Sequence, residues 1–343
     1  MATSESMRAL VVTKSGTMVL SEVAIPVPPV GWARVRVRAA GICATDLAIL
    51  DGQARVQFPV IPGHEWMGVV DQVGDSADSE WLGARVSGEN EVSCLRCERC
   101  RSGHPRWCAQ YQQIGFGRYG GSYAEYLIAP VYDLHRLGPV ISDDQGALLE
   151  PMAVALGILG RADLRIGETL TIIGDGPIGL HTLLVAKAMG ARRILLSGER
   201  STRLDMAQHM GAYRVVNHQT GDLQSLVDQY HGRSDVVVEA TGSELGLQQA
   251  IAAAKPEGRV IVAGFAHGAS AVIAPDAIHL PDLQVIGAGN NPGWMGRAVA
   301  LVEDELLSSE RLITHRFAIE QFEAAFHQLR EKPTDFVKSL LVF

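Results

Sequence analysis

The sequence predicts an α/β protein of two parts, a β-rich barrel-like domain and a doubly wound parallel sheet. Before Pro151, short strand-like segments lie between glycines and prolines. After Pro151, apolar runs rich in branched residues alternate with helical stretches. Strands that alternate with helices are typical of a parallel sheet with helices on both faces. At 343 residues the chain is long enough for two domains with full cores.

The first part is expected to contain strands that bury one side. Residues 34–39 alternate strictly between arginine and a small or apolar residue, which indicates a strand with one solvated face. In chain order, the expected strands are 9–12, 17–20, 34–39, 68–73 and 84–86. We expect the loops between them to carry Cys43, His64 and a segment with four cysteines.

The second part is expected to hold six parallel strands. They are predicted at residues 169–173, 193–196, 214–216, 235–238, 259–262 and 283–286. Helical stretches such as 203–210 and 245–254 separate them. From about residue 289 the chain indicates helices, including 322–330, and a last strand at 339–342 that packs back on the first part. The predicted domains are therefore 1–153 with 289–343, and 154–288.

A glycine-rich turn lies at the start of this sheet. It contains Gly174, Gly176, Pro177, Ile178 and Gly179. The turn follows a buried strand and opens an apolar helix, which is the context that dinucleotide binding requires. The glycines allow a tight turn, close approach of backbone to a pyrophosphate, and packing of helix on strand. The diphosphate would lie at the positive end of the helix.

Four of the five cysteines are spaced as C-x2-C-x2-C-x7-C. They are Cys94, Cys97, Cys100 and Cys108, and Cys43 is left over. An odd number of cysteines does not indicate a disulfide framework. Four thiolates this close can surround one tetrahedral zinc ion and close its site to substrate. The spacing therefore predicts a structural zinc.

A second set of candidate ligands is centred on Pro62-Gly63-His64-Glu65. A histidine and a glutamate side by side between glycines are poor core residues but good zinc ligands. Cys43 lies upstream and Glu150 downstream. Three protein ligands and an open position are typical of a catalytic zinc.

Composition excludes several other function classes. The formal net charge is −8 and no run is rich in lysine or arginine, which argues against nucleic acid and anionic membranes as partners. Apolar runs end well before the ~20 residues that a membrane span needs. Because no N-terminal stretch combines a basic start with an apolar segment, we expect a cytoplasmic protein.

Taken together, these motifs resemble those of the zinc-containing medium-chain dehydrogenases/reductases, which include alcohol, sorbitol and threonine dehydrogenases. The matching segments are 41–46, 63–68 with Gly74, the four cysteines, Glu150-Pro151 and 174–179. The resemblance implies a GroES-like β-barrel catalytic domain, a Rossmann domain, and a homodimer or homotetramer. It also implies about two zinc ions per chain, one held by Cys43, His64 and either Glu65 or Glu150.

The resemblance also implies the reaction. Zinc would lower the pKa of a substrate hydroxyl, and hydride would pass between the substrate carbon and the nicotinamide of NAD(P). Thr45 is placed as a proton relay, and Asp46 would orient the His64 ring. Many relatives carry a histidine where this chain has Ala48.

We expect the substrate to be a secondary alcohol or ketone, and specifically a polyol, sugar-derived or cyclitol hydroxyl. The Glu150-Pro151 pair and Trp66 resemble those of polyol, threonine and aminocyclitol dehydrogenases more than those of simple alcohol dehydrogenases, and this resemblance implies the substrate class. Residues that relatives place around the substrate are Phe116, Tyr119, Asn290, Asn291 and Trp294. The alternatives are a zinc-independent quinone or enone reductase of the same fold, and a non-catalytic relative that binds cofactor.

The choice between NAD and NADP depends on the end of the second strand of the sheet. Gly198 stands where NAD-binding relatives have an acidic residue, and Arg200 is placed to hold a 2′-phosphate. These two residues favour NADP, with Arg203 nearby. The alternative is NAD, with Glu199 bonded to the ribose hydroxyls.

Overall fold

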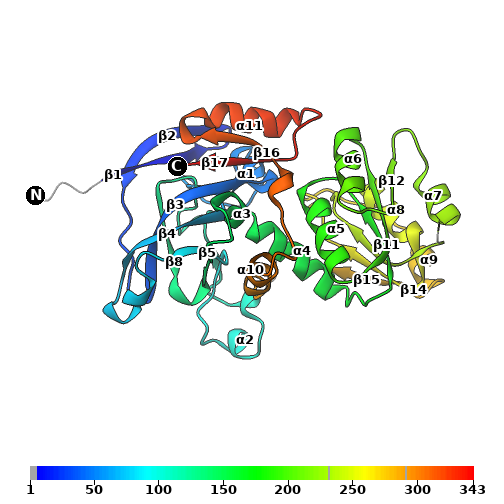
Figure 1. The fold of residues 1–343 in the computed structure, drawn as a ribbon, viewed down its shortest axis with the longest axis horizontal. Coiled ribbons are helices and arrows are strands. Elements are labelled where there is room, and N and C mark those ends of the chain that lie inside the picture. The colour runs from blue at the N-terminus through cyan, green and yellow to red at the C-terminus, as the bar shows by residue number, and fades with distance from the viewer. Residues whose placement is uncertain (1–5, 231, 290–291) are drawn as a thin grey trace, which may run out of the picture. The chain divides into compact units, whose positions relative to one another are not determined.

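A computed structural model describes residues 6–230, 232–289 and 292–343 (Figure 1). The chain divides into two compact units, Met1–Glu150 with Met295–Phe343, and Pro151–Trp294. Asn290 and Asn291, two of the predicted substrate-lining residues, lie outside the described residues. Within the described ranges, every helix is too short or too polar to cross a membrane.

The first unit is built on a seven-stranded sheet of order β16-β17-β3-β4-β5-β9, with β8 also paired to β3. The strands are β3 Trp32–Ile42, β4 Glu65–Val73, β5 Arg85–Gly88, β8 Tyr126–Pro130, β9 Leu134–Arg136, β16 Ile313–Ala318 and β17 Lys338–Val342. Two small antiparallel sheets accompany it, the hairpin of β1 Ser6–Lys14 with β2 Thr17–Ala24 and the pair of β6 Glu91–Val92 with β7 Gln112–Gln113. The hydrophobic core of the first unit includes the fully buried side chains of Trp66, Tyr123 and Phe336.

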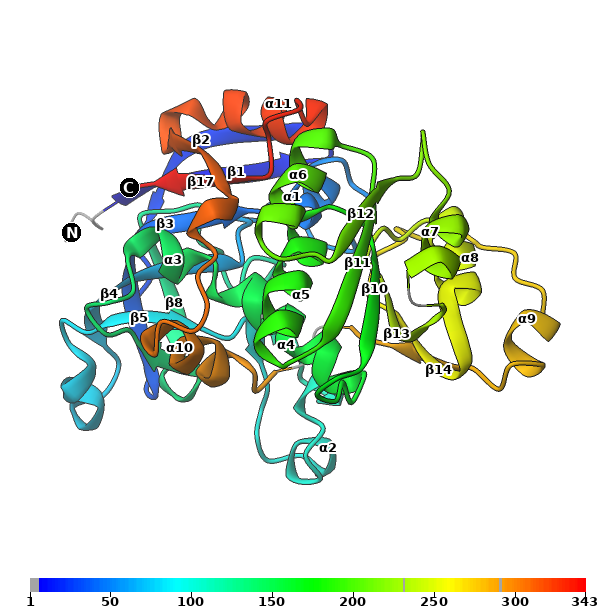
Figure 2. The same ribbon diagram turned by 45° about the vertical axis from the view of Figure 1, so that its right-hand side comes forward.

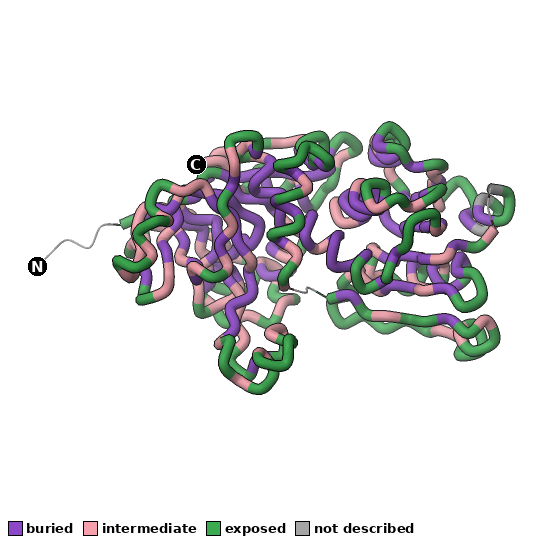
Figure 3. The backbone as a smooth tube through the Cα atoms, turned by 60° about the horizontal axis from the view of Figure 1, so that its bottom comes forward, coloured by how far each residue is buried: buried purple, intermediate pink, exposed green. Residues whose placement is uncertain are grey.

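Short helices join these strands. They are α1 Ala44–Leu50, α2 Glu98–Arg101, α3 Asp143–Ala147, α10 Met295–Glu303 and α11 Phe322–Glu331, with 3₁₀ turns η1 Ser76–Trp81, η2 Pro105–Trp107, η3 Val131–Asp133, η4 Glu310–Leu312 and η5 Ile319–Gln321. Helix α4, Leu149–Arg161, begins within the last two residues of the segment Met1–Glu150 and continues into the second unit. The loop around α2 projects from its unit (Figure 1), and its backbone is largely exposed (Figure 3).

The second unit is a parallel sheet of order β12-β11-β10-β13-β14-β15. Its strands are β10 Thr169–Ile173, β11 Arg192–Gly198, β12 Arg214–Asn217, β13 Ser234–Glu239, β14 Ala254–Val262 and β15 Gln284–Gly287. Its further helices are α5 Pro177–Ala188, α6 Ser201–His209, α7 Leu223–Tyr230, α8 Glu244–Ala253 and α9 Asp276–His279. Figure 2 shows α5 and α6 on one face of the sheet and α7 and α8 on the other. Chain order reverses between β10 and β13, the point at which such sheets bind ligands.

The predicted parallel sheet is confirmed, since each of the six predicted strands overlaps one of β10 to β15. All five residues of β10 are buried, as expected for a branched apolar run in the middle of a sheet. One difference concerns Cys43, which was expected in a loop. It lies at the N-cap of α1, where the Asp46 carboxylate accepts the Cys43 backbone N–H at 3.0 Å. That bond satisfies a donor at the start of the helix.

Candidate active site

Cys43, His64 and Glu65 come together at one end of the large sheet in the first unit. Cys43 follows β3, and His64 comes directly before β4. Because β3 and β4 are antiparallel with Gly41 opposite Glu65, the end of one strand meets the start of the other. The three residues each offer a ligand atom, and these atoms all lie within 4.8 Å of one another. The predicted pair Cys43 and His64 is thus brought to one place.

A buried carboxylate organises this end of the sheet. Asp46 is fully buried and accepts hydrogen bonds from the Gly63 backbone N–H at 3.1 Å and the Tyr123 hydroxyl at 2.6 Å. Its Oδ1 atom also lies 3.4 Å from Nδ1 of His64. Burial acts to raise the pKa of Asp46, but His64 and the hydrogen bonds outweigh it and lower that pKa. The Asp46 carboxylate therefore lies beside the His64 ring, a position that suits the orientation of a metal-binding imidazole.

Glu65 is held by a lysine from the other end of the chain. Nζ of Lys338 donates to Oε1 of Glu65 at 2.6 Å, and both side chains are buried. Oε2 of Glu65 is buried without a hydrogen-bond partner among the described residues. A Cβ at position 41 would lie 2.0 Å from this Oε2 atom, so Gly41 leaves the space that the carboxylate fills. A buried carboxylate oxygen without a donor is suited to binding a cation.

Glu150 lies in the same unit but outside this ligand group. Its Oε1 atom accepts from Nδ2 of Asn90 at 3.3 Å. Burial is the main cause that raises the pKa of Glu150 to about 8, and nearby Glu65 adds to the shift while His64 opposes it. The structure thus places Glu65 within the group of Cys43 and His64, and Glu150 beside it.

Thr45 stands on the first turn of α1, and its Oγ1 atom lies 3.6 Å from Sγ of Cys43. Among the predicted substrate-lining residues, the ring of Phe116 lies 5.4 Å from the His64 ring. Tyr119 packs on Trp32 with ring centroids 4.6 Å apart. Trp294 belongs to the second unit, where its ring packs over Gly157 and Gly160 of α4. Of these residues, Phe116 is thus the one with a described contact to the ligand group.

The four remaining cysteines form a compact cluster around α2 and η2. One ligand atom from each of Cys94, Cys97, Cys100 and Cys108 lies within 4.8 Å of the others. Backbone N–H groups point at the sulfurs, for example from Cys97 to Cys94 at 3.3 Å and from Gln110 to Cys108 at 3.3 Å. A hydrogen bond from the Cys100 backbone is the main cause that lowers the pKa of Cys97 to about 6. Burial and the neighbouring sulfurs raise the pKa of Cys100 to about 12 instead, so the backbone donors do not stabilise every thiolate equally. Four clustered thiols, several of them facing backbone N–H groups, suit a closed zinc site.

The glycine-rich turn joins β10 to α5 in the second unit. Gly174 has φ +121°, a conformation that other residues rarely adopt, and a Cβ on Gly176 would meet nothing within 4 Å. Gly174, Gly198 and Glu199 line a cavity of about 250 Å³ together with Asp175, His218 and Thr241. The open backbone at the N-terminus of α5 and this cavity suit a dinucleotide. Pro177, Ile178 and Gly179 form the first turn of α5.

Sequence reasoning did not identify Tyr123, Asn90 or Lys338 as part of the site. Tyr123 bonds Asp46, Asn90 bonds Glu150, and Lys338 bonds Glu65. Lys338 carried one signal, since a lysine at the head of the apolar strand 338–342 needs a buried partner. Its partner lies 273 positions away, which local sequence patterns do not reveal.

Comparisons with known proteins agree with this arrangement. Residues 29–139 match the alcohol dehydrogenase GroES-like domain, and residues 177–300 match the zinc-binding dehydrogenase family. The chain is 32% identical over 335 residues to L-threonine 3-dehydrogenase of Anaeromyxobacter dehalogenans, covering 94% of this chain and 96% of that protein.

Two solved structures have the same fold. One is a short chain alcohol dehydrogenase from Escherichia coli CFT073 in complex with NADH, at TM-score 0.93 and 26% identity, covering 98% of this chain and 99% of that one. The other is a putative zinc-binding dehydrogenase from Sinorhizobium meliloti 1021 bound to NADP, at TM-score 0.91 and 29% identity, covering 99% and 100%. The predicted GroES-like and Rossmann domains are confirmed. The chain belongs to the zinc-containing medium-chain dehydrogenase/reductase family of NAD(P)-dependent alcohol dehydrogenases.

Proposed function

We propose that this chain oxidises a secondary hydroxyl of a polyol, sugar-derived or cyclitol substrate, or reduces the corresponding ketone. The observation that carries the proposal is the group of Cys43, His64 and Glu65, whose ligand atoms lie within 4.8 Å of one another. A sulfur, a nitrogen and an oxygen are the donors of a catalytic zinc with an open position.

In this proposal, Cys43, His64 and Glu65 would hold the metal, and Asp46 would orient the His64 ring. Bound zinc would supply a Lewis acid for the substrate hydroxyl, and bound NAD(P) would supply the hydride acceptor. Glu150 stays beside the ligand group, bonded to Asn90. The Thr45 hydroxyl would accept the proton of the substrate hydroxyl while it passes its own proton on to water.

The preference for a polar substrate has two supports. The family relative named above is an L-threonine dehydrogenase, and threonine carries a secondary hydroxyl beside other polar groups. In this chain, Asn90 and Glu150 are buried polar side chains close to the ligand group. Oδ1 of Asn90 has no hydrogen-bond partner among the described residues. This favours substrates with further hydroxyls, because an apolar substrate would leave that buried acceptor unpaired.

The test is a dehydrogenase assay over polyols, cyclitols and amino alcohols, with both NAD and NADP, and with short primary alcohols as the control class. We expect turnover of at least one polar secondary alcohol, lost on treatment with a zinc chelator and in His64→Ala. Reduction of quinones or enones that survives the chelator would favour the zinc-independent reductase. Cofactor binding without turnover of any substrate class would favour the non-catalytic relative.

We also propose a homodimer or homotetramer in the cytoplasm. The edge strand β15 ends the sheet of the second unit, and its Val285 is 41% exposed. An edge strand can pair with the same strand of a second copy across a two-fold axis. Light scattering after size exclusion should give a multimer for the wild type and a smaller species for Val285→Lys.

The proposed cytoplasmic location has a separate support. None of the five cysteines, all of which the structure describes, is joined in a disulfide, as expected in a reducing compartment.

A further inference from the structure

The glycine-rich turn of this chain carries an acidic residue between its first two glycines. Asp175 is only 5% exposed and lines the cavity at the carboxyl ends of the strands. Its Oδ2 atom accepts the backbone N–H of Glu199 at 3.0 Å and of Arg200 at 2.8 Å. The carboxylate is therefore fixed at the end of β11, although it comes from the turn after β10.

The Asp175 side chain fills the space that a side chain on residue 198 would occupy if that residue were not glycine. A Cβ built on Gly198 would lie 2.4 Å from Cβ of Asp175, 2.5 Å from its Cγ and 2.6 Å from its Oδ2. Dinucleotide-binding sheets place an acidic residue near this strand end, where it bonds the ribose hydroxyls. In this chain the carboxylate is at that place, but residue 175 supplies it. Gly198 is thus explained by the room that Asp175 needs, rather than by room for a phosphate.

The groups that a 2′-phosphate would use at this strand end are already engaged. The two backbone N–H groups that point there donate to Asp175. Nη1 of Arg200 donates to Oε1 of Glu199 at 3.1 Å. Arg203 is buried, and burial lowers its pKa while the Asp175 carboxylate opposes that shift. The cationic side chains at this end are thus balanced by carboxylates before any cofactor binds.

Glu199 is the other candidate for the ribose carboxylate. Its Oε1 atom accepts from Arg200, and its Oε2 atom accepts from Nε2 of Gln219 at 3.2 Å. The Glu199 side chain is 40% exposed, whereas Asp175 is buried. Asp175 is therefore the better fixed of the two carboxylates in the cavity.

We propose that Asp175 is the specificity-determining residue that makes this enzyme select NAD over NADP. The inference deepens the proposed function and rests on it, since it concerns the cofactor of the same reaction. Asp175 accepts a hydrogen bond from the ribose 2′-hydroxyl of NAD. The same carboxylate repels the 2′-phosphate of NADP and keeps it from the backbone N–H groups of residues 199 and 200.

The test measures binding of NADH and NADPH by their fluorescence, without substrate, to the zinc-loaded protein. We expect the wild type to bind NADH at least about tenfold more tightly, because a hydrogen bond to a charged group is worth about that factor. Asp175→Asn keeps the shape and should shift the ratio of dissociation constants about tenfold toward NADPH. Glu199→Gln is the matched control, which removes the neighbouring charge and should shift the ratio by less than about threefold.

A variant that exchanges the residues at positions 175 and 198 tests the inference if Asp175→Asn folds poorly. We call it the exchange variant. Gly198→Asp alone should lower the thermal midpoint, because its Cβ meets Asp175. The double variant Asp175→Gly with Gly198→Asp should recover that midpoint and the preference for NADH.

Three results would overturn the inference. They are a wild type that prefers NADPH, a ratio that responds to Glu199→Gln but not to Asp175→Asn, and an exchange variant that prefers NADPH. All three leave the proposed dehydrogenase intact. Failure of the wild type to bind either cofactor would instead contradict the proposed function itself.

Discussion

Nζ of Lys338 lies 2.6 Å from Oε1 of Glu65, in a pair whose side chains are 3% and 2% exposed. The pair forms because β17 and β4 flank β3, with Ser339 opposite Ile42 and Glu65 opposite Gly41. Burial acts to lower the pKa of Lys338, but the charge and hydrogen bond of Glu65 together with the charges of Cys43 and Asp46 outweigh it and raise that pKa. The last strand of the chain therefore supplies the cation that holds a candidate metal ligand in place.

Replacement of Lys338 by methionine should destabilise the protein strongly. When no metal is bound at the Cys43 site, the change leaves the Glu65 carboxylate buried without a cation, which costs about 3–5 kcal/mol in comparable buried pairs. Urea denaturation of protein stripped of that metal by a mild chelator measures the free energy of unfolding. Lys338→Arg is the control, since it keeps the charge, and should lose much less. A loss below about 1 kcal/mol in Lys338→Met would show that the pair does not stabilise the site.

Glu65→Gln and Glu150→Gln should differ in zinc content. Oε2 of Glu65 is buried without a donor and belongs to the ligand group, whereas Glu150 is bonded to Asn90 outside it. We expect Glu65→Gln to lose zinc from the Cys43 site on dialysis against a weak chelator, and Glu150→Gln to keep it. Zinc per chain by elemental analysis is the measurement. Loss of zinc in Glu150→Gln alone would assign Glu150 as the direct ligand.

Thr45→Ala should lower kcat by about a hundredfold, the usual loss when a proton relay is removed. Thr45 lies 3.6 Å from the Cys43 sulfur, and Ala48, one turn on, has no group to replace its hydroxyl. Thr45→Ser keeps the oxygen and should stay close to the wild type. Steady-state kinetics across pH distinguishes the two variants. Normal turnover in Thr45→Ala at every pH would mean that the hydroxyl carries no proton.

Asp235 should stabilise the second unit in a pH-dependent way. Burial acts to raise the pKa of Asp235, but hydrogen bonds from Lys255 and Thr169 outweigh it and lower the pKa to about 2. Because the folded-state pKa is lowered, the stabilisation is present above the unfolded value near 3.9 and is lost as pH falls through about 2. Asp235→Asn should therefore cost roughly 1 kcal/mol at pH 7, and the difference from wild type should shrink below about pH 4.

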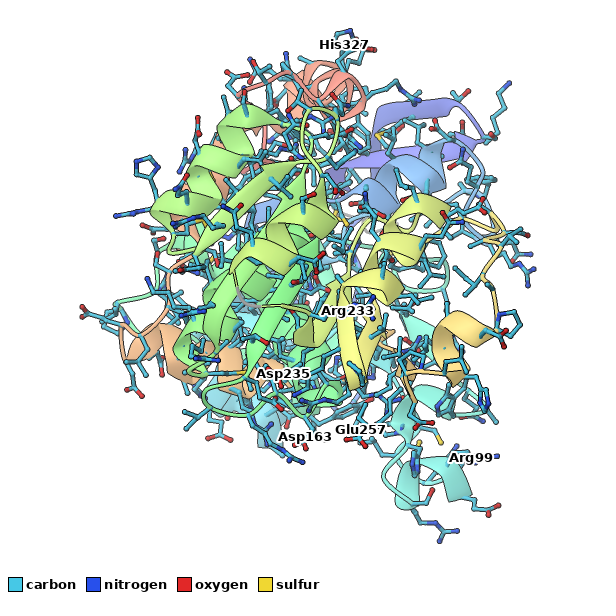
Figure 4. All side chains as sticks on the ribbon, turned by 90° about the vertical axis from the view of Figure 1, so that its right-hand side faces the viewer. Arg99, Asp163, Arg233, Asp235, Glu257 and His327 are labelled. Atoms are coloured by element: carbon cyan, nitrogen blue, oxygen red, sulfur yellow. The ribbon has the colours of Figure 1, made fainter. Side chains whose placement is uncertain are left out.

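The matched control for Asp235 is Asp163→Asn at the same end of the unit, where Figure 4 shows both residues. The Asp163 side chain is 72% exposed and bonds only to Arg165 among the contacts described, so its replacement should change stability little. Urea denaturation at several pH values compares the two variants. An equal loss in both, or a loss in Asp235→Asn that persists unchanged down to pH 3, would contradict the prediction.

The sequence predicted the elements whose pattern is local. β10 is Thr169–Ile173 as expected, because a branched apolar run between polar turns has few alternatives to a buried strand. The four clustered cysteines and the pair Cys43 and His64 were also found, since their spacing or their neighbours mark them. Contacts between distant segments were not found. The register of β17 on β3 brings Lys338 to Glu65, and the turn at Asp175 reaches the end of β11. Neither the contact between Lys338 and Glu65 nor that between Asp175 and the end of β11 can be predicted from a local sequence pattern.

Zinc content and turnover of Cys43→Ser, compared with Cys97→Ser, test the central claim most directly. We expect about two zinc ions per chain in the wild type. Cys43→Ser should lose one of them and all turnover of the alcohol substrate while it still folds and binds NADH. Cys97→Ser should lose the other zinc and much of its thermal stability, because a closed zinc site contributes to folding. Full turnover in Cys43→Ser, or a single zinc per chain in the fully active wild type, would contradict the account.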